Sequence, residues 1–555
     1  MRGWRVCRWC ATGAALLAIA GTPPGAAPAS AAQPRRHLAP VRQWDNGWST
    51  GAVFYEAFVR SFADSDGDGI GDLRGLIGKL DYLNDGNPSS TTSLGVDAIW
   101  LMPVFGSPSY HGYDVSDYEN VSPAYGSDDD FAQLCQEAHR RGMRVILDFV
   151  MNHTSSEHPW FVSAASSSSS PTRDWYVWSP SDLGWRQPWD LFTGADTWHL
   201  NPADGDWYYG MFWSGMPDLN YRNPGVRVEM ERLAELWLDR GADGFRLDAA
   251  RYLIEDGSGT QQQDTPETHA FWREFATEIR TERPDATMVG EVWADTPTIA
   301  RYYGSTSAVR GGDELPMCFD FPLAAAIVAG VNGGSATGIA ATLAQVQAAY
   351  PPGAEDAPFL TNHDMIRVAT QLANSPGRLR NAAAILLTLP GSPFVYYGEE
   401  VGLQNGGTGS DDVLKRTPMP WDNGSGFTTG TPWTAYAPGR ATANVAAETG
   451  DPGSLLSRYR ALIRARHASP ALLRGDLETL PGGNGTLLAF LRATSGERVL
   501  AVHNLGDSLV GGASLTVAGT SADTLFADGG ASLSIGGGSA HVTLPPRGSG
   551  IWRLH

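Results

Sequence analysis

The chain has 555 residues, of which 42% are apolar and 18% are charged, so it is long enough to form several packed domains. Its formal net charge is −20. Nucleic-acid phosphates bind clustered Lys and Arg, and we therefore expect no nucleic-acid partner for so acidic a chain. The composition suits a soluble protein that acts on neutral substrates.

The first 32 residues have the pattern of a signal peptide. A basic segment with Arg2, Arg5 and Arg8 precedes the apolar run ATGAALLAIAG, and small residues near Ala31 offer a cleavage site. The apolar run is too short to cross a membrane, and no later segment is long enough. The sequence therefore predicts a signal peptide at 1–32 and a secreted, extracellular protein with no membrane partner.

Two of the four cysteines, Cys7 and Cys10, belong to the predicted signal peptide. The remaining two, Cys135 and Cys318, cannot form a disulfide framework. We interpret them as buried free thiols, because unpaired cysteine behaves as a small apolar residue. A single disulfide between them is the alternative.

Eight short, almost continuously apolar segments follow one another along the first 400 residues. Segments of this kind are typical of strands buried on both faces of a parallel sheet. The predicted strands are residues 52–59, 97–103, 144–150, 243–248, 287–292, 317–321, 357–362 and 393–400.

Helical patterns separate these strands. We expect Asp128 to be the N-cap of one helix that Gly142 ends, and Gly241 to end another. The predicted helices include residues 128–142, 226–241 and 269–284. Eight strands that alternate with helices predict a (β/α)8 TIM barrel of the α/β class.

Two further regions depart from the barrel pattern. Residues 154–222 are rich in tryptophan and too long for one loop, which predicts a small domain inserted after the third strand. After a helix at 453–467, residues 478–555 hold short alternating runs, which predict an antiparallel β-sandwich. The predicted domains are a barrel in two parts (45–153 and 223–468), the inserted domain (154–222) and a C-terminal β domain (469–555).

The segment DSDGDGIGDL, residues 64–73, spaces four aspartates like the first half of an EF-hand loop. Gly75 stands where such a loop has its bidentate Glu, and the preceding residues have a β-rich pattern instead of a helical one. We therefore exclude a calcium-sensing EF-hand and place the segment after the first strand. Four carboxylates in nine residues repel one another, which favours a bound hard cation over the alternative, a solvated turn.

Charged side chains follow the C-terminal ends of several predicted strands, which meet at one mouth of a barrel. They are Asp148, His153, Arg246, Asp248, Glu291, His363 and Asp364. Two opposed carboxylates can hydrolyse a glycosidic bond, one as nucleophile and one as proton donor. Each carboxylate taken singly suits a salt bridge, but their coincidence at successive strand ends favours catalysis.

The neighbours of two carboxylates suggest how they divide these tasks. Arg246 lies two residues before Asp248 in a strand, so both side chains point to one face and Arg246 can lower the pKa of Asp248. Glu291 has apolar neighbours, which favour the raised pKa of a general acid.

Several segments resemble the conserved regions of glycoside hydrolase family 13, the α-amylase superfamily. The first four regions are matched in order by DFVMNH (148–153), GFRLDAARY (244–252), GEVW (290–293) and FLTNHD (359–364). Further matches are MPDLN (216–220), YHGYDVSDY (110–118) and RTPMPW (416–421). The resemblance covers residues 45–555 and is nearest to secreted bacterial-type α-amylases of the intermediate group between oligo-1,6-glucosidase and neopullulanase.

The resemblance implies Asp248 as the nucleophile, Glu291 as the acid/base and Asp364 as the third carboxylate, in a retaining double displacement. The implied substrate-binding residues are His111, Tyr113, Asp114, His153, Arg246, His363 and Arg416. Of these, Asp114 and Arg416 resemble a pair that contacts the non-reducing end of the substrate in pocket-shaped relatives.

The resemblance also implies a structural calcium in the loop after the first strand. The implied ligands are the side chains of Asp64, Asp66, Asp68 and Asp72 and the backbone carbonyl of Ile70. No phosphate-binding Gly-rich motif follows a strand, so we expect calcium and no organic cofactor.

The most specific prediction is a secreted α-amylase that hydrolyses internal α-1,4 bonds of starch and maltooligosaccharides. The sequence leaves two alternatives open: an exo-acting α-glucosidase or oligo-1,6-glucosidase, and a transglycosylase such as trehalose synthase. A non-catalytic transporter subunit is disfavoured, because all three carboxylates are present and no membrane anchor is predicted. We expect an α-glucan or oligosaccharide as substrate and a monomeric protein.

Overall fold

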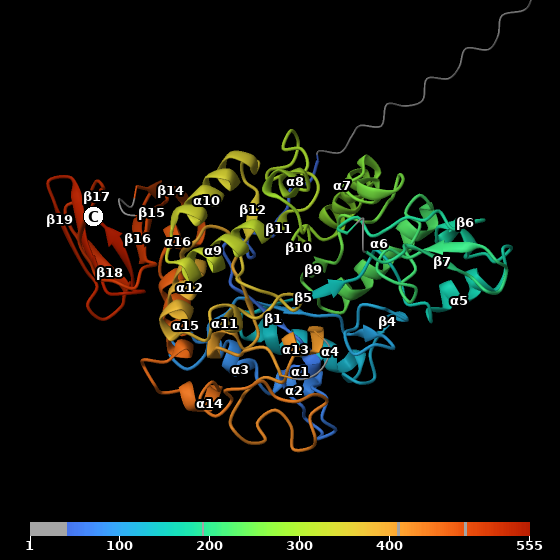
Figure 1. The fold of residues 1–555 in the computed structure, drawn as a ribbon, viewed down its shortest axis with the longest axis horizontal. Helices are drawn as coiled ribbons and strands as arrows, with labels where there is room; N and C mark the ends of the chain where they lie inside the picture. Colours follow the sequence, from blue (N-terminus) through green and yellow to red (C-terminus); the bar gives the residue numbers. More distant parts are fainter. Residues whose placement is uncertain (1–40, 191–193, 408–410, 482–484) are drawn as a thin grey trace, which may run out of the picture. The chain divides into compact units, whose positions relative to one another are not determined.

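Eight short parallel strands form the centre of the fold (Figure 1). They are β1 (Phe54–Ala57), β2 (Ala98–Leu101), β5 (Arg144–Phe149), β9 (Gly244–Leu247), β10 (Thr287–Gly290), β11 (Met317–Phe319), β12 (Glu355–Ala357) and β13 (Phe394–Tyr396). The strand order is β12-β11-β10-β9-β5-β2-β1-β13. A parallel bridge between Phe359 and Phe394 joins the two ends. The predicted (β/α)8 barrel is confirmed.

The structure, a computed structural model, describes residues 41–190, 194–407, 411–481 and 485–555, and residues 42–555 form one compact unit. The predicted signal peptide, residues 1–32, lies outside the described residues. No helix in the described part of the chain is both long and apolar enough to cross a membrane. Cys135 and Cys318 are buried free thiols, as predicted.

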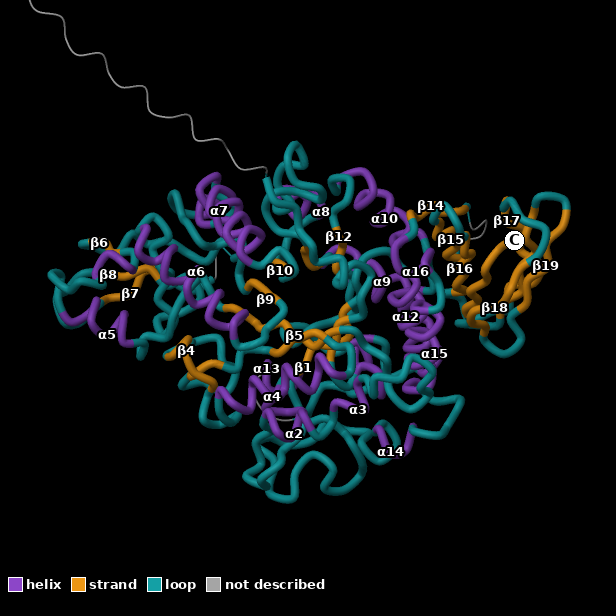
Figure 2. Tube along the Cα trace, turned by 180° about the vertical axis from the view of Figure 1, so that it is seen from behind, coloured by secondary structure: helices purple, strands orange, loops and turns teal. Residues whose placement is uncertain are grey.

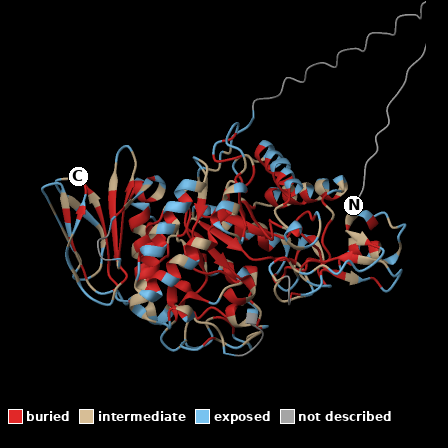
Figure 3. Ribbon diagram, turned by 45° about the horizontal axis from the view of Figure 1, so that its top comes forward, coloured by how far each residue is buried: buried red, intermediate tan, exposed pale blue. Residues whose placement is uncertain are grey.

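The barrel interior is filled by large apolar side chains. Phe54 of β1 stacks on Phe394 of β13 with ring centroids 4.4 Å apart, and Trp100 and Phe319 pack beside them. Alternate strand residues, such as Tyr55, belong to the larger core beneath the helices. Both faces of each strand are therefore buried, which explains the continuous apolar runs (Figure 3).

Helices surround the strands (Figure 2). Those before the sixth strand are α1 (Val59–Phe62), α2 (Leu73–Ile77), α3 (Leu80–Leu83), α4 (Asp128–Arg140), α5 (Pro159–Ser166), α6 (Pro224–Asp239), α7 (Pro266–Glu282) and α8 (Thr296–Arg301). Those after it are α9 (Phe321–Gly333), α10 (Thr337–Ala349), α11 (Val368–Gln371), α12 (Pro376–Thr388), α13 (Asp411–Lys415), α14 (Val445–Glu448), α15 (Leu455–His467) and α16 (Pro470–Arg474).

The ends of the predicted helices agree with the structure in part. Gly142 and Gly241 follow the C-caps of α4 and α6 with φ of +81° and +112°, a backbone conformation that glycine tolerates best. The prediction of Asp128 as N-cap is wrong. Ser127 caps α4, and its side chain and that of Asp130 form a reciprocal capping box.

The segment between β5 and α6 forms the inserted domain. It contains α5 and a small antiparallel sheet in the order β6-β8-β7, with β6 at Trp178–Ser179, β7 at Trp198–Leu200 and β8 at Trp207–Tyr209. Trp198, Tyr209 and Met211 form a buried cluster of their own. Trp189 and Trp213, in contrast, are about half exposed. The exact boundaries at residues 154 and 222 stay a prediction.

The C-terminal strands form two antiparallel sheets. The first has the order β14-β15-β16-β21-β18 and the second β17-β20-β19. Their bounds are β14 (Asp476–Leu480), β15 (Leu487–Ala493), β16 (Arg498–Asn504), β17 (Val510–Thr516), β18 (Ala522–Ala527), β19 (Ser532–Gly536), β20 (Ser539–Leu544) and β21 (Ser549–Leu554). Leu500 and Trp552 of one sheet and Val542 of the other share one core. The predicted β-sandwich is confirmed.

Several barrel strands are shorter than predicted; the eighth, predicted at 393–400, ends at Tyr396. The seventh strand, predicted at 357–362, ends at Ala357, because Pro358 has no N–H with which to continue the ladder. The residues that follow therefore lie on a loop. The first strand also ends early, at Ala57, and one helical turn, α1, leads into the Asp-rich loop.

Candidate active site

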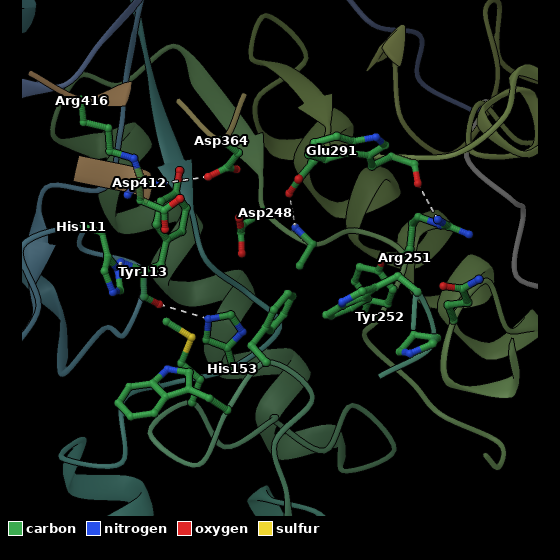
Figure 4. A pocket seen from close by; sticks show the side chains of 18 residues that line it. His111, Tyr113, His153, Asp248, Arg251, Tyr252, Glu291, Asp364, Asp412 and Arg416 are labelled. Carbon is green, nitrogen blue, oxygen red and sulfur yellow. Dashed lines mark hydrogen bonds and ion pairs between the residues drawn. The ribbon is translucent and has the colours of Figure 1, made fainter. Parts of the chain in front are cut away.

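A cavity of about 710 Å³ brings together most of the residues predicted for the site. All three predicted catalytic carboxylates line it (Figure 4). In Figure 4, Asp248 lies between two groups of side chains. Asp364, Asp412, Arg416 and His111 are on one side, and Glu291, Arg251 and Tyr252 are on the other.

One buried guanidinium joins three of the carboxylates. Arg246 Nη1 lies 2.5 Å from Asp248 Oδ1 and 2.9 Å from Asp148 Oδ1, and its Nη2 lies 2.8 Å from Glu291 Oε2. The Arg246 side chain is 1% exposed. The alternation of β9 places Arg246 and Asp248 on the same face, as predicted. The guanidinium of Arg246 thus links two carboxylates of the cavity, Asp248 and Glu291, from beneath the cavity surface.

The third carboxylate has different cationic partners. Asp364 lies 2.8 Å from Arg416 Nη2 and 3.1 Å from His363 Nε2. Nδ1 of His363 lies 2.6 Å from Glu56 Oε1, and both side chains are buried. The backbone N–H of Asp364 donates to Asn362 Oδ1 at 3.0 Å, which fixes the loop after β12.

These surroundings move the pKa values in opposite directions. Burial raises the pKa of Asp248 and of Glu291, although Arg246 opposes both increases. The expected lowering of the Asp248 pKa by Arg246 is therefore outweighed. Burial alone would also raise the pKa of Asp364, but His363 and Arg416 hold it well below its usual range.

His363 is the charged counterpart of Asp364. Burial would lower its pKa, but Asp364 and Glu56 raise it to about 9. His363 therefore stays protonated at neutral pH. For His153, burial outweighs the opposing effects of the Tyr113 carbonyl and Asp114 and lowers the pKa to about 4, so it stays neutral.

Aromatic and imidazole side chains form the wall beside Asp248. Tyr113 donates from its hydroxyl to Asp148 Oδ2 at 2.8 Å, and its ring stacks on His363 with centroids 5.4 Å apart. His153 Nε2 lies 3.1 Å from the Tyr113 carbonyl oxygen. His111 Nδ1 accepts from the Tyr113 N–H at 3.1 Å. Tyr113 therefore offers a fixed ring beside the catalytic carboxylates.

The predicted substrate-binding residues separate into two groups. Those that line the cavity are His111, Tyr113, His153 and Arg416. Arg246, His363 and Asp114 lie behind its surface and are almost completely buried. Asp114 and Arg416 do not form an ion pair with each other. Asp114 accepts from the hydroxyls of Ser107 and Ser109 at 2.6 and 2.5 Å, and Arg416 pairs with Asp364.

Some site residues were absent from the prediction. Glu56 belongs to no recognised motif. Its role depends on its contact with His363, which lies 307 positions later in the chain. Asp412 and three half-exposed tryptophans line the cavity. These tryptophans are Trp189, Trp213 and Trp293. The tryptophan density of the inserted segment was a signal for the first two, but their orientation depends on the fold.

The Asp-rich loop brings oxygen ligands together away from the cavity. Carboxylate oxygens of Asp64, Asp66 and Asp72 lie within 4.8 Å of one another, the one such cluster in the described part of the chain. Asp68, also predicted as a ligand, is not part of this cluster, and its Oδ1 accepts from the Ile70 N–H at 2.7 Å. Hard carboxylate oxygens at this spacing fit calcium.

A later segment of the chain holds this loop. The N–H of Asp64 donates to the Phe427 carbonyl at 2.9 Å, and the hydroxyl of Thr428 donates to Asp64 Oδ2 at 2.5 Å. The N–H of Trp433 donates to the Gly69 carbonyl at 2.9 Å. The loop thus joins the start of the barrel to residues that follow the RTPMPW segment.

Comparison with known proteins places the chain in a family. The model of the α-amylase catalytic domain matches residues 56–475. Alpha-amylase 3 of Dictyoglomus thermophilum is 40% identical over 471 residues, which are 84% of this chain and 87% of that protein. The trehalose synthase/amylase TreS of Mycobacterium tuberculosis is 36% identical over 507 residues, covering 83% and 82%. The crystal structure of the α-amylase from H. orenii has a TM-score of 0.82 at 38% identity and covers 91% of this chain and 100% of its own.

The matched region runs from Glu56 in β1 to Gly475, beyond α16, and so contains the barrel except for the first two residues of β1, together with the inserted domain and the cavity. The relatives include both hydrolases and a synthase, as their names say. The fold, the site and these relatives agree: the chain belongs to glycoside hydrolase family 13, the α-amylase superfamily of glycoside hydrolases and transglycosylases.

Proposed function

We propose that the protein is a secreted α-amylase that cleaves internal α-1,4 bonds of starch and maltooligosaccharides with retention of configuration. The observation that carries this proposal is the arrangement of Asp248 and Glu291 on one guanidinium inside a cavity. Retaining glycosidases use two carboxyl groups about 5 Å apart, and a shared Arg246 favours such a short separation.

Asp248 is the nucleophile in this mechanism. Arg246 contacts Oδ1, which leaves Oδ2 to attack the anomeric carbon. The bond from the anomeric carbon to the leaving oxygen breaks as the bond to Asp248 forms. Arg246 opposes the effect of burial on the Asp248 pKa and so favours the ionised form that a nucleophile requires.

Glu291 is the acid and then the base. Burial raises its pKa, so that it can carry a proton at the start of the reaction. It gives this proton to the leaving oxygen. In the second step it accepts a proton from the water that attacks the anomeric carbon, and Asp248 leaves.

The remaining cavity residues bind the sugar. Asp364 stays ionised and can accept hydrogen bonds from two sugar hydroxyls, while Tyr113 stacks on the ring and His153 lines the cavity beside it. Arg246 and His363 act from behind by holding the carboxylates, and not by contact with the sugar.

Internal cleavage requires space beyond the sugar at Asp364. An ion pair between Asp114 and Arg416 would limit that space, and this pair is not formed. The half-exposed Trp189, Trp213 and Trp293 extend the cavity as apolar platforms on which further glucose rings can stack. These features favour a glucan chain over a single terminal glucose.

A transglycosylase is the second candidate. The cavity lining includes the aromatic side chains of Tyr252, Phe212 and Trp293, which favour a sugar acceptor over water. The similarity of the chain to a trehalose synthase/amylase supports this alternative.

We also propose that the protein binds a structural calcium and is secreted. Asp64, Asp66 and Asp72 would hold calcium and join α1 to α2, with Asp68 and the Ile70 carbonyl as the remaining predicted ligands. The ion would neutralise the loop and stabilise the barrel, but would take no part in the reaction. The predicted signal peptide supports secretion, and we propose a monomer.

One experiment tests the activity. The protein without residues 1–32 is incubated with soluble starch, maltose, sucrose and pullulan, and the products are followed over time by chromatography. Mixed maltooligosaccharides from starch, with α-configuration at first, are expected. Glucose alone from maltose would favour the exo-acting α-glucosidase, and trehalose from maltose would favour the synthase.

A further inference from the structure

The residue directly after the proposed nucleophile has an unusual backbone. Ala249 has a φ of +50°, in the left-handed region that residues with a Cβ rarely adopt. It is 3% exposed and lines the cavity. Strained backbone of this kind persists where the surroundings hold it, and it concentrates at functional sites.

The surroundings of Ala249 hold this conformation from both sides. The Asp248 N–H donates to the Phe149 carbonyl at 3.3 Å, and the Tyr252 N–H donates to the Ala249 carbonyl at 3.0 Å. The Trp272 indole N–H donates to the Ala250 carbonyl at 2.8 Å. The turn after β9 is therefore fixed, and its direction is imposed by the fold.

This turn directs one backbone N–H at the other catalytic carboxyl group. The Ala249 N–H donates to Glu291 Oε2 at 2.9 Å, a bond drawn as a dashed line at Glu291 in Figure 4. The same oxygen lies 2.8 Å from Arg246 Nη2. Within the described part of the chain, Oε1 of Glu291 accepts no hydrogen bond from the protein.

We propose that the Ala249 N–H is a positioning group that, together with Arg246, directs the catalytic proton of Glu291 to Oε1. Oε2 faces two N–H donors and has no room for a proton of its own between them. The proton is therefore carried by Oε1, the oxygen left for the leaving group.

The same two donors assist the reaction as it proceeds. When the glycosidic bond breaks, the proton moves from Oε1 to the leaving oxygen, and negative charge develops on Glu291. Hydrogen bonds to an ionised acceptor are stronger than those to a neutral one, so the Ala249 N–H binds the product carboxylate more tightly. In the second step, Oε1 takes a proton from water and the charge disappears again.

Removal of this one N–H tests the proposal, which rests on the proposed role of Glu291 as general acid. Ala249 is replaced by lactic acid through nonsense suppression, which exchanges the N–H for an oxygen and keeps the methyl group. Ala286 is the matched control, because it is also 3% exposed and its N–H donates to the Arg283 carbonyl at 3.0 Å, away from the cavity.

The experiment measures how kcat/KM depends on the leaving group of the substrate. The substrates are maltotetraose, whose sugar leaving group needs protonation, and 2-chloro-4-nitrophenyl α-maltotrioside, whose acidic phenol does not. For the ester at 249 we expect kcat/KM to fall about tenfold on maltotetraose and by much less on the aryl glycoside. The ester at 286 should change kcat/KM by the same factor on both substrates. Equal changes for the ester at 249 would overturn the proposal.

Side-chain variants provide a second measurement. In Ala249→Val the branched side chain disfavours positive φ and should move the N–H from Glu291, so the ratio of the two kcat/KM values should change as in the ester. Ala249→Gly accepts positive φ and should restore the ratio. If Val and Gly gave the same ratio, the proposal would be wrong.

Glu291→Gln separates this inference from the proposed function. This variant should lose about 10²-fold or more on maltotetraose and far less on the aryl glycoside. If it shows no such difference, Glu291 is not the general acid and the proposed mechanism fails. If Glu291→Gln loses more activity on maltotetraose than on the aryl glycoside, and the ester at 249 affects both substrates equally, only the proposed role of Ala249 is wrong.

Discussion

The molecule has two regions rich in carboxylates, and they treat negative charge in different ways. In the Asp-rich loop, Asp66 and Asp68 are exposed, and the loop aspartates accept hydrogen bonds mainly from nearby backbone N–H groups. In the cavity, Asp248 and Glu291 are largely buried and share the guanidinium of Arg246. The loop is suited to binding an external cation, whereas the cavity supplies its own.

This difference has a chemical consequence. A carboxylate exposed to water and to backbone N–H groups can serve as a ligand for a cation. A buried carboxylate beside a fixed cation has a pKa that small changes can move, which is what acid and base catalysis requires. The comparison therefore predicts that equivalent substitutions in the two regions affect different properties.

The largest expected effect is that of Asp248→Asn on turnover. The amide cannot attack the anomeric carbon, so kcat on starch should fall by at least about 10³-fold while the far-UV circular dichroism stays unchanged. Asp66→Asn, the same change in the exposed loop, should keep most of the kcat. Near-normal turnover in Asp248→Asn would refute the assignment of the nucleophile.

Removal of calcium should affect the loop and leave the site chemistry intact. A ligand at 100 times its Kd stabilises the folded state by about 2.7 kcal/mol, so EDTA should lower the Tm by a few degrees. Asp66→Asn should lower the Tm and reduce the response to EDTA, whereas Asp285→Asn, an exposed aspartate elsewhere, should do neither. An unchanged Tm together with no bound metal in elemental analysis would contradict the calcium site.

The buried cation–carboxylate network should make stability depend on alkaline pH. The folded-state pKa of His363 is about 9, above its usual 6.5, so its contribution is complete below about pH 6.5 and is lost as the pH rises towards 9. Glu56→Gln removes one of the groups that raise this pKa, so the loss should be complete at a lower pH. Urea unfolding between pH 6 and 10 measures this.

A second buried pair provides the control for that measurement. Glu314 lies 2.7 Å from His269 Nδ1, away from the cavity. Glu314→Gln should change the free energy of unfolding but leave the pH dependence of the His363 contribution where it is in the wild type. The same pH shift in both variants would show that the effect does not come from His363.

The smallest expected effect concerns the apolar platforms of the cavity. Trp213 is 49% exposed, and its ring packs so closely over Gly215 that a Cβ there would lie 2.2 Å from it. Loss of one stacking partner in Trp213→Ala should raise the KM for starch up to about tenfold with little change in kcat. Val162→Ala, at a similarly exposed apolar position outside the cavity, should leave KM unchanged.

The sequence predicted the barrel well, because its strands are buried on both faces and therefore read as continuous apolar runs. Period-two alternation also placed Arg246 and Asp248 on one face. The Asp-rich loop was visible because its aspartates lie within nine residues of the chain. Three of its four predicted carboxylates converge in the structure, whereas Asp68 does not.

The parts that sequence could not predict depend on contacts between distant segments. Glu56 is one more polar residue in an apolar strand until the fold brings it to His363. The partner of Arg416 is Asp364 and not Asp114, because two serine hydroxyls already satisfy Asp114. The early end of the seventh strand follows from Pro358, a local signal that the apolar pattern concealed.

The hydrogen bond between Thr428 and Asp64 spans 364 positions of the chain, and β1 also pairs with β13. The ribosome therefore makes the first strand and its acidic loop on the order of tens of seconds before their partners exist. Until then, the edge of β1 has no β13 to pair with, and the acidic loop lacks its hydrogen bond from Thr428. Contacts of such long range slow folding, and they leave the newly made chain accessible to chaperones before the barrel can close.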